Sequence, residues 1–170
     1  MQGWRVTCRA CGAVLADVWS DENRAGLSDL GRFQDEARAG EEIVEAYAGR
    51  RQSFQVSPAT MLRLLLLRRR PSPQEVRDQP ELPRRLIGTI IQEFDTVADD
   101  HGLNTAIGRS TVLPMIIRLR LLAGLAIVMK NPLEQLSRLC QSRAFGPQFD
   151  RVLAQDPIVT PNALLQSHLT

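Results

Sequence analysis

Apolar residues recur at steps of three and four along most of the chain, which is the spacing of one helix face. The first such segment runs from Leu27 to Tyr47 and carries acidic residues on its opposite side. Gly40 interrupts it, and glycine costs about 1 kcal/mol in a helix interior. The pattern therefore predicts one helix or two, with Gly40 as the weak point.

Later helices are indicated by a polar residue followed by proline. The polar side chain can accept from an unpaired backbone N–H, and proline loses nothing at the first helical position. Four such pairs occur, namely Ser57-Pro58, Ser72-Pro73, Asn131-Pro132 and Thr160-Pro161. Each pair predicts the start of a helix or helical turn.

The segments between these starts also have helical patterns. The run Met61–Leu67 is dense in leucine, and residues 86–102 give the cleanest amphipathic pattern. Residues 111–130 are long and apolar, but Arg118 and Arg120 lie near the middle, and each would cost roughly 2.5–3.5 kcal/mol at a membrane centre. We therefore expect a buried core helix there. Two shorter helices are expected at about 132–143 and 147–155.

The N-terminal residues instead alternate between apolar and polar, which indicates two short strands around a turn at residues 4–19. The sequence thus predicts a mainly α fold, a helical bundle-like body with a small N-terminal β-hairpin. We expect the hairpin at 1–22 and a single helical domain at 23–170. Prolines gather at 71–83, which predicts a loop that could act as a hinge.

The turn of this hairpin holds Cys8 and Cys11, followed by Gly12. Two residues between thiols let both sulfurs reach one tetrahedral ion, and glycine relieves the tight turn. The segment resembles the metal-binding knuckle of zinc-ribbon proteins, although the resemblance is confined to residues 4–19. Zinc ribbons have a second cysteine pair, which this chain lacks.

Several readings of Cys8 and Cys11 stay open. A zinc ion could be completed by Cys140, His101 or His168, or shared with the same pair in a second copy. The thiols could also form a redox pair, or simply pack. Cys140 itself lies on an apolar helical face and is more typical of a buried small hydrophobe.

Composition narrows the class of protein without naming an activity. Three cysteines give no disulfide framework, and the first residues lack a signal-peptide layout, so we expect a cytoplasmic protein. Lys130 is the only lysine among the basic residues. This bias towards arginine is typical of a GC-rich genome, and arginine also suits bidentate phosphate binding.

The net charge is only +2, but charge is unevenly distributed. Residues 49–85 carry nine arginines against three acids, whereas residues 1–48 carry five against nine. Two arginine clusters flank the proline-rich loop, and they could neutralise phosphates of a nucleic acid. The clusters are Arg68, Arg69 and Arg70 before the loop, and Arg84 and Arg85 after it. Cations at a helix N-terminus, as expected for Arg84 and Arg85, oppose the helix dipole, and such local conflicts tend to fall at functional sites.

Residues 132–151 faintly resemble a helix-turn-helix unit. In that arrangement Gln148 and Arg151 would contact base edges and Arg143 would contact phosphate. The segment between the two helices is long for this motif. A second weak match runs from Val97 into the helix after Ser110.

We see no phosphate-binding glycine-rich loop, paired-histidine motif or nucleophile elbow. An acidic cluster at Asp95, Asp99 and His101 could hold a metal, but a solvated helix surface explains it more simply. We therefore expect a non-enzymatic, nucleic-acid-associated accessory or regulatory protein, with a protein partner or a homo-oligomer and no membrane. The alternative is a protein-interaction adaptor without nucleic-acid contact, in which the leucine run 62–67 and the acidic first helix engage partners.

Overall fold

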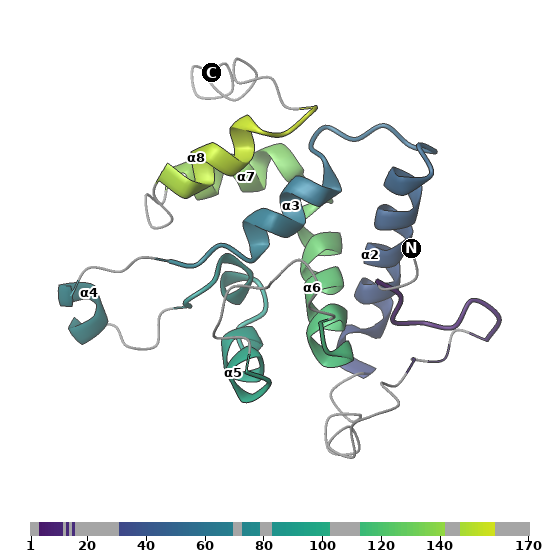
Figure 1. The fold of residues 1–170 in the computed structure, drawn as a ribbon, viewed down its shortest axis with the longest axis horizontal. Helices are drawn as coiled ribbons and strands as arrows, with labels where there is room; N and C mark the ends of the chain where they lie inside the picture. Colours follow the sequence, from purple (N-terminus) through teal and green to yellow (C-terminus); the bar gives the residue numbers. More distant parts are fainter. Residues whose placement is uncertain are drawn as a thin grey trace.

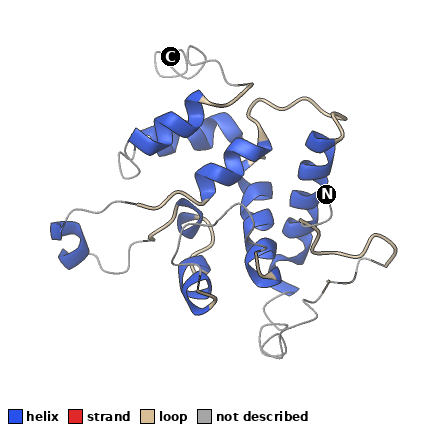
Figure 2. Cartoon of the chain, viewed as in Figure 1, coloured by secondary structure: helices blue, strands red, loops and turns tan. Residues whose placement is uncertain are grey.

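The computed structural model describes residues 4–11, 13, 15, 31–69, 73–78, 83–102, 113–141 and 147–158. These residues are mostly helical, as Figures 1 and 2 show, so the predicted mainly α class is confirmed. The elements are the 3-10 helix η1 (Gly31–Phe33), α2 (Gln34–Ala48), α3 (Pro58–Leu65), α4 (Pro73–Asp78), the 3-10 helix η2 (Leu86–Thr89), α5 (Phe94–Asp100), α6 (Met115–Val128), α7 (Pro132–Gln141) and α8 (Pro147–Ala154).

Helix α6 lies at the centre of the body and contacts η1, α2, α3 and α5. It is buried along almost its whole length, including Arg118 at 9% exposure and Arg120 at 0%. The predicted core helix is therefore confirmed, although it begins at Met115. Among the described residues, no helix combines the length and the apolar character needed to cross a bilayer.

Helix α2 is continuous through Gly40, which is buried against α6. A Cβ atom at Gly40 would lie 2.7 Å from the carbonyl carbon of Leu122 and closer still to its oxygen. The absence of a side chain therefore lets the two helix backbones approach. Gly40 is a packing position rather than the weak point that helix propensity predicts.

Three of the predicted proline starts are confirmed, at Pro58, Pro73 and Pro132. The fourth, at Pro161, lies outside the described residues. The expected side-chain cap is absent at Ser57, whose hydroxyl oxygen is buried without a hydrogen-bond partner. Its backbone N–H instead donates to the carboxylate of Asp156 at 3.0 Å, which connects the start of α3 to the residues after α8.

The amphipathic segment 86–102 is not one helix. It divides into η2 and α5, with a turn at Ile90–Glu93 between them. The turn brings Asp95 of α5 back to the backbone before η2, where the Arg84 and Arg85 N–H groups donate to its carboxylate at 2.6 and 3.1 Å. Tertiary hydrogen bonds therefore outweigh the periodic helical pattern here.

The leucine run lies inside the protein. Leu62, Leu64 and Leu65 are buried, and Leu66 and Leu67 pack against the same core. The expectation that this run would engage a partner is therefore wrong for the chain in this conformation, because the run forms part of the folded core.

At the N-terminus, Cys8 N–H donates to the Ala13 carbonyl and Leu15 N–H donates to the Val6 carbonyl, both at 2.8 Å. Both bonds join the residues before the Cys8–Cys11 turn to the residues after it. Much of the expected hairpin at 1–22, and its boundary with the helical domain, lie outside the described residues. The expected hinge at 71–83 includes α4, and its role as a hinge stays a prediction.

Candidate nucleic-acid interface and cysteine turn

Two segments distant in sequence meet at an antiparallel bridge between Arg68 and Arg85. Arg69 N–H donates to the Arg84 carbonyl at 2.7 Å, and Leu86 N–H donates to the Leu67 carbonyl at 3.1 Å. The structure therefore brings together four arginines of the two predicted clusters. We call Arg68, Arg69, Arg84 and Arg85 the arginine bridge. Arg70 lies outside the described residues.

Within the bridge, Arg85 is buried rather than exposed. Its side chain is 6% exposed, and its guanidinium contacts the Asp95 carboxylate at 2.6 Å. A buried, paired guanidinium of this kind holds the bridge against α5. Its position departs from that of a phosphate contact, which needs access to solvent.

Arg84 forms an ion pair with Asp99, one turn after Asp95 on α5. Its side chain nevertheless remains 61% exposed. The two aspartates thus supply negative charge beside Arg84 and Arg85. These ion pairs offset the unfavourable interaction of the two arginines with a helix dipole. Asp95 and Asp99 follow Arg85 and Arg84 by ten and fifteen residues in sequence.

The same contacts bear on the acidic cluster at Asp95, Asp99 and His101. Both carboxylates are engaged by arginines, and His101 follows the end of α5. Across the part of the chain that the structure describes, no group of three metal-ligating side chains occurs. The two aspartates therefore stabilise the fold by pairing with Arg84 and Arg85.

The exposed part of the bridge consists of Arg68, Arg84 and the half-buried Arg69. Arg68 and Arg69 also make contacts within the protein. These three guanidinium groups are the part of the arginine bridge from which phosphate contacts would come, because arginine can bind phosphate oxygens in a bidentate manner.

The predicted recognition helix corresponds to α8. Phe149, Val152 and Leu153 are buried, and the helix contacts α3. Gln148 is half-buried and Arg151 is exposed. Arg143 lies outside the described residues, as does the connection between α7 and α8, so the helix-turn-helix interpretation stays a prediction.

Cys8 is half-buried and Cys11 is exposed, and both are free thiols. The pKa of the Cys8 thiol is lowered, chiefly by a hydrogen bond from the Cys11 backbone N–H, then by one from Ala10 and by contact with the Cys11 thiol. We call residues Cys8–Cys11 the cysteine turn. The turn favours a thiolate at Cys8, which is the form that binds metals. The side chain of Cys140 and all of His168 lie outside the described residues.

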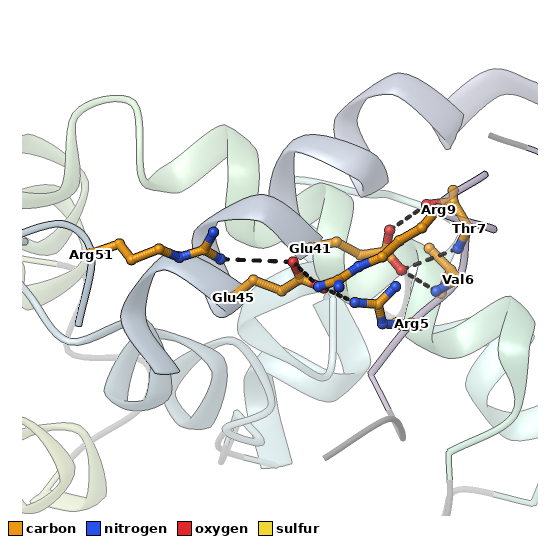
Figure 3. Close-up of polar contacts among 7 residues, drawn as sticks. All are labelled: Arg5, Val6, Thr7, Arg9, Glu41, Glu45 and Arg51. Carbon is orange, nitrogen blue, oxygen red and sulfur yellow. Dashed lines mark hydrogen bonds and ion pairs between the residues drawn. The ribbon is translucent and has the colours of Figure 1, made fainter. Parts of the chain in front are cut away.

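Glu41 of α2 connects this N-terminal segment to the helical body. Its buried carboxylate accepts from the backbone N–H of Val6, from that of Thr7 at 3.1 Å, and from the Thr7 hydroxyl (Figure 3). From α6, the Arg118 guanidinium donates to the Arg5 carbonyl at 3.1 Å. Residues 5–7 are therefore held by both central helices.

Glu45, one turn further along α2, pairs with three arginines. Arg5 contacts one of its oxygens, and Arg9 and Arg51 lie at 2.8 and 3.8 Å from the other (Figure 3). The Arg9 hydrogen bond and the neighbouring positive charges lower the pKa of Glu45, against a smaller opposing effect of burial. One signal in the sequence indicates this arrangement, namely acidic residues four positions apart on one helix face, but nothing in the sequence places the N-terminus beside them.

A groove of about 710 Å³ lies beside α2 and the C-terminal end of α6. Ile43 and Met129 line its apolar part. Its acidic lining comes from α2, in Asp35, Glu36, Glu42 and Glu45, and Arg51 and Lys130 also contribute. A groove lined by both apolar and acidic side chains can accept a partner that carries aliphatic and basic side chains.

Comparison of the chain with protein-family models, with curated proteins and with solved structures found no match.

Proposed function

We propose that the protein is a non-enzymatic accessory or regulatory protein that binds the phosphate backbone of nucleic acid through the arginine bridge. The observation that carries the proposal is the antiparallel bridge between Arg68 and Arg85, which joins two arginine clusters across an intervening helix. Arg68, Arg69 and Arg84 would contact phosphates, and Arg85 would position them through its pair with Asp95.

The physical support comes from charge and geometry together. The backbones that carry these arginines are held together by hydrogen bonds, so the loss of backbone freedom on binding is reduced. Each phosphate contact releases counterions, and affinity then falls with salt at a slope of about −0.9 per contact on duplex DNA. Three contacts would weaken binding by roughly fortyfold between 50 and 200 mM salt.

The test is binding of labelled DNA and RNA to the full-length protein over that salt range. We expect the double variant Arg68→Ala with Arg69→Ala to bind more weakly and to lower the salt slope by about two. Both substitutions keep the backbone N–H groups that form the bridge. A matched control, Arg38→Ala with Arg138→Ala, removes the same charge from exposed positions on α2 and α7.

Equal losses in the two double variants would contradict the proposal, because net charge rather than the bridge would then drive binding. No binding of either nucleic acid at 50 mM salt would also reject it. Circular dichroism of each variant would show whether the fold is retained.

A protein-interaction adaptor is the second candidate, favoured by the acidic and apolar groove beside α2. It predicts that a helical peptide with alternating leucine and arginine faces binds the wild type. Binding should weaken at least tenfold in Glu36→Gln with Glu42→Gln and stay unchanged in Arg68→Ala with Arg69→Ala. The opposite dependence would assign binding to the arginine bridge.

A further inference from the structure

The cysteine turn has the local geometry of a thiolate ligand pair. Two residues separate Cys8 from Cys11, and the Cys8 N–H donates to the Ala13 carbonyl at 2.8 Å, which closes the turn that holds both thiols. Two residues between thiols in one turn let both sulfurs reach a single tetrahedral ion.

The number of metal ligands shows that the two cysteines alone cannot complete a structural zinc site. Structural zinc is almost always bound by four ligands in a tetrahedron, most often thiolates and imidazoles. Around Cys8 and Cys11, the described residues supply no third metal-ligating side chain. His101, the one histidine in the described ranges, is therefore not grouped with the two cysteines. We propose that the cysteine turn is half of a tetrathiolate zinc site, and that Cys8 and Cys11 of a second copy of this chain complete it.

The position of the turn suits approach by a second copy. Cys11 is exposed, and the N-terminal loop, drawn in purple, extends away from the helices in Figure 1. Residues on the N-terminal side of the turn are held to the body, because Glu41 accepts hydrogen bonds from Val6 and Thr7. The ligand pair is therefore accessible while its base is fixed.

Zinc binding at a shared site would release protons. Four thiolates and one Zn²⁺ carry a net charge of −2, and four thiol protons leave to solvent as the metal binds. Arg9, which lies between the two cysteines in sequence, already pairs with Glu45 at 2.8 Å, and this ion pair holds the start of the turn to α2.

The test uses the full-length protein, reduced and stripped of metal with a chelator, then titrated with Zn²⁺. Native mass spectrometry should show a dimer with one zinc ion per two chains, which returns to the monomer on chelation. Titration with Co²⁺ should give the absorption of a tetrahedral thiolate complex, saturating at the same one-to-two ratio. Cys8→Ser and Cys11→Ser should each abolish both signals while keeping the helical circular dichroism spectrum.

Cys140→Ser and His168→Ala are the controls, because these are the other side chains that could complete a site within one chain. Both should keep the zinc-linked dimer. The proposal is overturned by a monomer with one zinc ion, by loss of zinc in either control variant, or by the absence of zinc binding at micromolar concentrations. It does not depend on nucleic-acid binding, which the cysteine variants should leave intact.

Discussion

Gly40 of α2 packs directly against the backbone of Leu122 in α6, with no room for a methyl group between them. We expect Gly40→Ala to destabilise the protein by roughly 2 kcal/mol or more, because the helices must separate to accommodate the added atom. This loss would exceed the gain of about 1 kcal/mol that alanine gives in a helix interior. Chemical unfolding of both proteins would measure the difference.

Gly31→Ala is the control for this prediction, because a Cβ atom there would meet nothing within 4 Å. Its free energy of unfolding should stay within about 0.5 kcal/mol of the wild type. A Gly40→Ala protein that is as stable as Gly31→Ala would contradict the direct packing of Gly40 against the Leu122 backbone.

Asp95 should be essential for the arginine bridge. Asp95→Asn keeps the shape of the side chain but leaves Arg85 buried beside a neutral group, and breaking such a pair costs about 3–5 kcal/mol. We expect a loss in that range in the free energy of unfolding. Asp35→Asn, at a side chain that is 91% exposed, should change stability by less than about 0.5 kcal/mol.

A second comparison separates charge burial from shape. If Arg85→Met is combined with Asp95→Leu, no unpaired charge remains, and stability should recover relative to Asp95→Asn. Stability that falls further in the double variant would mean that the backbone hydrogen bonds to Asp95, rather than its charge, hold the bridge.

Glu45 should make the attachment of the N-terminal segment depend on pH. Since the arginines lower its pKa in the folded protein, its contribution to stability is full above the pKa of an unfolded glutamate, about 4.3. The contribution is lost as the pH falls from there through the lower folded value. The difference in unfolding free energy between wild type and Glu45→Gln should therefore be positive at pH 6 and shrink as the pH falls below about 4.

Glu42→Gln is the matched control, because Glu42 is exposed on the same helix. Its difference from the wild type should change little over this pH range. A Glu45→Gln protein whose difference stays constant between pH 6 and pH 3 would contradict the assigned ion pairs.

The helical starts could be predicted because their signals are local. Proline at a first helical position acts through its own backbone, and Pro58, Pro73 and Pro132 all begin helices. Gly40 shows the limit of this reasoning. Propensity describes an isolated helix, whereas the stability of α2 comes from the backbone of α6 against which Gly40 packs.

The site residues show the same division between local and distant information. Sequence reasoning found both arginine clusters but could not foresee that Asp95 and Asp99 would pair with Arg84 and Arg85, since only the turn after η2 brings them together. Glu41 and Glu45 belong to the acidic side of the first predicted helix, and nothing in their local sequence indicated their partners. Their partners in the N-terminal segment lie more than thirty residues away in sequence.

The bridge between Arg68 and Arg85 also holds together the two ends of the segment that lies between these residues in sequence. The chain leaves and re-enters the body as two hydrogen-bonded neighbours, and α4 lies away from the other helices in Figure 1. Helix α4, in the segment between the bridged residues, therefore has the position of an insertion on the helical body. We therefore expect the length of this segment to be open to change in evolution or design, because hydrogen bonds at its base hold the two ends of the core together whatever length of chain joins them.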